Sequence, residues 1–164
     1  MNANPSPRHS DFASLVAAEF DEIEKFSQIL ESEQQALKQG EIDKLPEIAR
    51  SKSEYLVKLS QLGSARDNHL KLNGIGTDAT SLKQFIQRED PGSHLSLQES
   101  WDKLLASAKR AQELNQLNGA MIETLLKHNQ QALAILQDAA QQNGLYGPDG
   151  HSRSIGSGRQ LGKI

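Results

Sequence analysis

Apolar residues recur at alternating steps of three and four over most of this chain, and this heptad spacing constrains the fold more than any other feature. The spacing places one apolar stripe along a helix, and such a stripe has to be buried against other helices. The longest stripe falls between Ser96 and Gly144 and contains no proline. Its members are Leu97, Trp101, Leu104, Ala108, Ala111, Asn115, Asn118, Ile122, Leu125, Asn129, Ala132 and Leu136. At 1.5 Å per residue, a helix over this segment is roughly 70 Å long.

Two similar stripes come earlier. One starts at Ser10 or Asp11 and ends at Gly40, and the other runs from Leu45 to His69 and is ended by Asn73-Gly74-Ile75-Gly76. Pro46 is compatible with the second helix because it falls in the first turn. A short amphipathic helix is expected over residues 81–88.

Ser81 and Gln84 have the spacing of a capping box for this short helix. No segment shows the alternation of a strand. The sequence therefore predicts an all-α fold, an antiparallel long-helix bundle of three long helices plus one short helix with coiled-coil-like packing.

Opposite charges interrupt the first two stripes at matching places. The first stripe contains Glu19 and Glu33, and the second contains Lys52 and Arg66. In an antiparallel hairpin both helices advance equally, so one register pairs Glu33 with Lys52 and Glu19 with Arg66. The same register aligns every apolar layer, although solvated charges at the edge of the seam are an equally acceptable interpretation.

The composition excludes several classes of protein. There is no cysteine, which removes disulfides and thiolate chemistry, and the net charge of −3 does not favour nucleic acid. The N-terminus lacks an apolar signal core, and no apolar run approaches the ~20 residues of a membrane span. We therefore expect a cytoplasmic protein without a membrane span.

Three regions follow from these patterns: a flexible N-terminal arm over residues 1–10, a helical bundle over 11–143, and a flexible Gly/Ser-rich basic tail over 144–164. The five histidines do not pair at metal-ligand spacing, and no catalytic or nucleotide-binding motif is present. The sequence thus predicts no catalytic, cofactor or metal site. His69, followed by Lys71 and Gly74, leaves a histidine-phosphotransfer bundle as an alternative, although an ordinary histidine near a helix end explains it better.

Two stretches resemble the FlgN family of flagellar export chaperones. The first has the pattern Leu30-x-x-Glu33-x-x-Ala36-Leu37-x-x-Gly40-Glu41, followed by Leu45, Ile48, Lys52 and Leu56. The second has the pattern Asn115-x-x-Asn118-Gly119-x-x-Ile122, followed by Asn129, Leu133, Leu136 and the segment Leu145-Tyr146-Gly147-Pro148-Asp149-Gly150. The resemblance extends from about Phe12 to Gly150 and does not include the tail beyond.

The resemblance implies a cytoplasmic type III export chaperone. Such proteins bind the unfolded C-terminal segments of hook-associated (hook–filament junction) proteins and deliver them to the flagellar export gate and its ATPase apparatus. A generic coiled-coil adaptor is the other alternative.

The longest helix is predicted to outrun the hairpin, which leaves its C-terminal half without covering partners. The expected partner-binding residues are Asn115, Asn118, Met121, Ile122, Leu125, Asn129, Leu133, Leu136 and Tyr146, and Leu126 belongs to the same apolar surface. The asparagines would suit a wet, reversible interface, or they could instead fix the register of the bundle.

Overall fold

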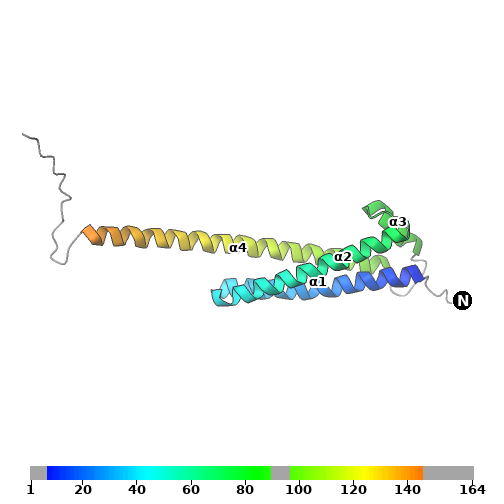
Figure 1. Ribbon diagram of the computed structural model, residues 1–164, viewed down its shortest axis with the longest axis horizontal. Coiled ribbons are helices and arrows are strands. Elements are labelled where there is room, and N and C mark those ends of the chain that lie inside the picture. Colours follow the sequence, from blue (N-terminus) through cyan, green and yellow to red (C-terminus); the bar gives the residue numbers. More distant parts are fainter. Residues whose placement is uncertain (1–6, 90–96, 146–164) are drawn as a thin grey trace, which may run out of the picture. The chain divides into compact units, whose positions relative to one another are not determined.

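A computed structural model describes residues 7–89 and 97–145 of the 164-residue chain. In chain order it contains helix α1 (Pro7–Gln39), the short 3₁₀ helix η1 (Ile42–Lys44), and helices α2 (Leu45–Leu72), α3 (Ala79–Glu89) and α4 (Leu97–Leu145) (Figure 1). The predicted all-α class, with three long helices and one short helix, is confirmed. The chain divides into two compact units, Met1–Met121 and Ile122–Ile164, which are described separately below.

Two helix ends differ from the sequence-based expectation. Helix α1 begins at Pro7 rather than at Ser10 or Asp11, so it starts within the segment predicted as an arm. Proline suits this position because its fixed φ is helical and the first amide of a helix has no intrahelical acceptor. Helix α4 is a single helix through Gly119, and it ends at Leu145, slightly beyond the predicted stop at Asn143.

The glycine stops of α1 and α2 are confirmed. Gly40 and Gly74 adopt φ values of 71° and 70°, a left-handed conformation that costs glycine little. After α2, the Gly74 amide donates to the Lys71 carbonyl and the Ile75 amide donates to the Leu70 carbonyl. These bonds satisfy carbonyls that the last turn of the helix would otherwise leave unpaired.

The predicted capping box of α3 is wrong, because Ser81 lies inside the helix. Asp78 caps it instead: its Oδ1 accepts the Ser81 amide at 2.9 Å and its Oδ2 accepts the Ser81 hydroxyl at 2.5 Å. These two hydrogen bonds from Ser81 hold the pKa of Asp78 below its usual value. Aspartate competes well with serine for this position, which is why the sequence signal was ambiguous.

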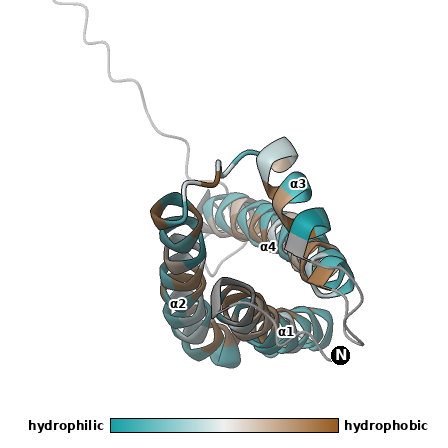
Figure 2. Ribbon diagram, turned by 90° about the vertical axis from the view of Figure 1, so that its right-hand side faces the viewer, coloured by the Kyte–Doolittle hydropathy of each residue, from teal (hydrophilic) through white to brown (hydrophobic). Residues whose placement is uncertain are grey.

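The core of the first unit is built around α1. Its buried members come from all four α-helices: Phe12, Val16, Ile23, Phe26, Leu30, Leu70, Leu82, Phe85, Ile86, Leu97, Leu104 and Ala111. Figure 2 shows hydrophobic stretches, in brown, on each of these helices. At the α3 end, the ring of Phe12 lies edge-on to Phe85 with centroids 5.2 Å apart and tilted 6.4 Å from Trp101. The four helices therefore share one apolar core, as the spacing of their stripes requires.

Candidate partner-binding surface

The hairpin of α1 and α2 has the predicted register. Lys52 Nζ donates to both carboxylate oxygens of Glu33 at 2.8 and 2.9 Å, and Arg66 Nη1 lies 2.5 Å from Glu19 Oε2. The exposed fractions of the two carboxylate side chains are only 6% for Glu33 and 12% for Glu19. The pairs thus lie within the helix interface and are not solvated charges at its edge.

In addition to the apolar core, polar groups join helix α4 to the hairpin. The Ser107 hydroxyl donates to Glu24, and Arg110 Nη2 lies 2.5 Å from Glu31 Oε1. The Arg66 guanidinium also stacks over the Trp101 ring, 5.3 Å from its centroid, which ties α2 to α4.

Asn118 is the centre of the most buried polar contact. Its side chain is fully buried, and its Nδ2 donates to the Leu30 carbonyl at 2.7 Å and to Glu33 Oε2 at 2.9 Å. Among the described residues, nothing donates to its Oδ1. The expectation that asparagines fix the register of the bundle therefore describes Asn118, which in this conformation is not accessible to a partner.

These contacts also show where the cover of α4 by α1 ends. The bonded residues of α1 and α4 are 79 to 88 positions apart and advance together, so the two helices are parallel. Because both helices rise equally, the counterpart of Gln39, the last residue of α1, is at about residue 122 of α4.

Residues 122–141 of α4, which belong to the second unit, are called the distal segment. From Glu123 to Gln141 every side chain is exposed except Leu125, which is half-buried. The large apolar side chains Leu126, Leu133, Ile135 and Leu136 are 57%, 58%, 68% and 65% exposed. Leu126, Leu133 and Leu136 lie on one face of the helix, whereas Ile135 lies on the opposite side. Exposed apolar residues gathered on one helix face commonly mark a binding surface.

The predicted contact residues divide into four groups. Asn115, Asn129, Leu133 and Leu136 are exposed, and Met121, Ile122 and Leu125 are half-buried. Asn118 is buried within the bundle. Tyr146 lies outside the residues that the structure describes.

Leu126, Leu133 and Leu136 lie on a second heptad line of the distal segment, which the sequence-based analysis did not identify. We call it the distal seam: it consists of Ile122, Leu126, Asn129, Leu133, Leu136 and Ala140, at alternating steps of four and three. The spacing was present in the sequence, but the predicted stripe ran through Leu125 and Ala132 instead. Two interleaved heptad lines cannot be ranked from spacing alone, because both satisfy the periodicity.

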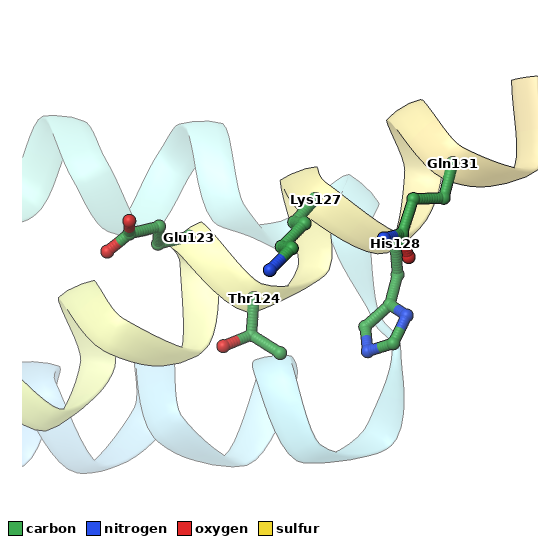
Figure 3. Close-up of a pocket in the computed structure, with 5 residues that line it drawn as sticks. All are labelled: Glu123, Thr124, Lys127, His128 and Gln131. Carbon is green, nitrogen blue, oxygen red and sulfur yellow. The ribbon is translucent and has the colours of Figure 1, made fainter. Parts of the chain in front are cut away.

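The opposite side of the distal segment is polar, with Ile135 as its one large apolar side chain. A shallow hollow there is lined by Glu123, Thr124, Lys127, His128 and Gln131 (Figure 3). All five residues belong to one helix, so the hollow has no second wall of the kind that encloses a ligand. Within the described ranges, no group of three or more histidine, aspartate or glutamate side chains could hold a metal ion.

His69, the candidate of the phosphotransfer alternative, is half-buried at the end of α2. Its ring centroid lies 6.1 Å from that of Phe12, and Asn73 Nδ2 lies 3.4 Å from its Nε2. The imidazole therefore packs against the core end of the bundle.

Comparisons with known proteins identify the family. Residues 9–154 match the family described as FlgN protein. The chain belongs to the FlgN family. It is 30% identical over 144 residues to the flagella synthesis protein FlgN of Yersinia enterocolitica, covering 85% of this chain and 88% of that protein. It is 33% identical over 136 residues to FlgN of Proteus mirabilis, covering 81% of this chain and 84% of that protein.

A solved structure agrees with the FlgN assignment at the level of the fold. A flagella synthesis protein of this family from Pseudomonas aeruginosa superposes with a TM-score of 0.61 at 24% identity, over 74% of this chain and 90% of that one. The chain is thus a FlgN-family protein of flagellum synthesis. Among the helices that the structure describes, none is both long and apolar enough to cross a membrane.

The residues that carry the FlgN resemblance lie partly inside the bundle and partly on the exposed distal segment. Asn118 is bonded inside the bundle, whereas Ile122, Asn129, Leu133 and Leu136 belong to the distal seam. One run of similar residues therefore contains both a packing group and a candidate binding surface.

Proposed function

We propose that this FlgN-family protein is a non-catalytic, cytoplasmic export chaperone that binds hook-associated proteins before their secretion. The distal segment of α4 is the client-binding surface, and the occupant is the unfolded C-terminal segment of the client. The observation that carries the proposal is the exposed apolar face of the distal segment, on which Leu126, Leu133 and Leu136 are each more than half exposed.

The chemistry of this face suits a client without fixed shape. Leucine and methionine side chains repack readily around different partners, and an amphipathic segment can fold onto the helix as it binds. Polar groups on the far side, such as Glu123 and Lys127, keep the free helix solvated. After binding, the complex is delivered to the export gate and its ATPase apparatus, and Tyr146 contributes to that delivery.

The test is a pair of double variants assayed for binding to a purified hook-associated protein. Leu125→Glu with Leu133→Glu is expected to abolish client binding, because two carboxylates would be buried in an apolar contact, while helicity and thermal melting stay nearly unchanged. The matched control, Gln131→Glu with Ala134→Glu, adds the same charge on the polar side and should bind normally. Client binding that persists in the folded Leu125/Leu133 variant would reject the proposed surface, as would unfolding of that variant.

Delivery is tested separately with Tyr146→Ala, which is expected to bind the client normally but to reduce export and motility. His69→Ala is expected to retain motility. Loss of motility in a folded His69→Ala protein would favour phosphotransfer instead.

A further inference from the structure

The distal seam contains a single polar position. Asn129 lies between Leu126 and Leu133, and every other seam residue is apolar. The distal segment has only three formally charged residues, Glu123, Lys127 and Asp138, and none of them lies on the seam. A partner helix on this seam would therefore meet apolar groups everywhere except at one amide.

The first unit shows what such an amide binds when a helix covers it. Asn118 lies three helical turns before Asn129, at the centre of a heptad line that α1 covers. Its amide donates both to a backbone carbonyl and to the carboxylate of a seam glutamate, Glu33. In this chain, then, a buried seam asparagine of α4 is matched by a Leu-x-x-Glu pattern on the helix that packs against it.

We propose that the distal seam binds one amphipathic partner helix, and that this helix presents a seam glutamate to Asn129. The inference rests on the proposed binding role of the distal segment and specifies its partner. One helix suffices because the seam follows strict four-and-three steps, the pattern of a two-helix contact. A second copy of the seam would offer Asn129 only another neutral amide, because none of its six residues carries a carboxylate for a charge-assisted bond.

The amide makes the seam selective. Covering Asn129 with an entirely apolar helix removes its amide from water without supplying an acceptor, whereas a glutamate supplies one in a charge-assisted bond. The penalty for an unsatisfied buried group corresponds to a loss of affinity on the order of tenfold. A polar seam residue that sets the register and excludes other partners is a known device of coiled coils.

The experiment measures the binding of labelled amphipathic peptides of about 20 residues to the full chain by fluorescence anisotropy. The peptides have leucine at all other seam positions, share the same flanking charges, and differ only at the central seam position, which is Glu, Gln or Leu. The wild-type chain should bind the Glu peptide on the order of tenfold more tightly than the Leu peptide, with Gln between them. Asn129→Leu should reverse this order. Gln130→Leu, an equivalent change one residue off the seam, should preserve it.

Two results of the peptide titrations would overturn the inference: equal or tighter binding of the Leu peptide by the wild-type chain, or no binding of any peptide. A dimer detected by light scattering and strengthened by Asn129→Leu would assign the seam to a second copy and would also overturn it. The proposed function fails independently. If the peptides bind with the expected selectivity but hook-associated proteins do not bind, then the inference about the seam holds and the proposed client is wrong.

Discussion

The carboxylate of Glu33 has two donors from two different helices, Lys52 of α2 and Asn118 of α4. The Glu33 side chain is 6% exposed and that of Lys52 is 18% exposed, so water compensates little for a lost partner. The stability of such a pair therefore depends on both members being present, because removal of one leaves a buried charge.

Lys52→Met is expected to lower the free energy of unfolding by about 3 kcal/mol, since Glu33 would keep only the Asn118 amide. The control is Lys44→Met, which removes the exposed pair with Glu41 and should cost less than about 0.5 kcal/mol. Urea denaturation followed by circular dichroism measures both. Similar small losses for the two variants would mean that the Glu33 pair is as solvated as the surface pair.

The pairs with Glu33 and Glu19 could be predicted from sequence because a short hairpin loop fixes how α1 and α2 face each other. The burial of Asn118 could not be predicted in the same way. It depends on the offset between α1 and α4, which are parallel and joined through α2, α3 and the segments between them. Heptad spacing shows which face of a helix is buried, but it does not show how far the neighbouring helix is displaced along the helix axis.

Among the elements, the glycine before α3 and a glycine within α4 have opposite requirements. A Cβ added at Gly76, before α3, would lie 2.6 Å from both Asp78 Oδ2 and Ser81 Oγ and 2.9 Å from Ser81 Cβ, so it would disrupt the cap. A Cβ added at Gly119, within α4, would meet no atom within 4 Å.

We therefore expect Gly76→Ala to destabilise the protein by about 1 kcal/mol through loss of the cap. Gly119→Ala should stabilise it by about 0.5–1 kcal/mol, because alanine restricts the unfolded chain and favours the helix. Chemical denaturation of both variants measures whether each substitution raises or lowers the free energy of unfolding. A destabilising Gly119→Ala would indicate that the helix at this position needs glycine for a reason other than propensity.

At the scale of the whole molecule, the sequence predicted the helices and the excess length of α4, and the structure confirms both. The sequence could not show which of two heptad lines in the distal segment stays exposed, because Leu125 and Leu126 satisfy the periodicity equally. Leu126 is exposed whereas Leu125 is half-buried, which distinguishes the lines, and exposure depends on the packing of the whole chain. The sequence therefore predicts the hairpin most completely and the candidate site least completely.

The two units should differ sharply in hydrogen exchange. Amides of α4 between Leu104 and Asn118 lie in the bundle, where Leu104, Ser107, Ala111 and Asn118 are buried, so they should exchange only on global unfolding. Amides of residues 123–141 are held almost entirely by the bonds of an exposed helix, and an isolated helix of this length is marginal in water. We expect exchange orders of magnitude faster in this segment, and slowing there when the Glu peptide or a client is added. Mass spectrometry of peptides from dilute protein measures the difference, and a dilution series controls for self-association. If residues 123–141 exchange as slowly as Leu104–Asn118 at every concentration, the distal segment is covered within the free chain and is not an open binding surface.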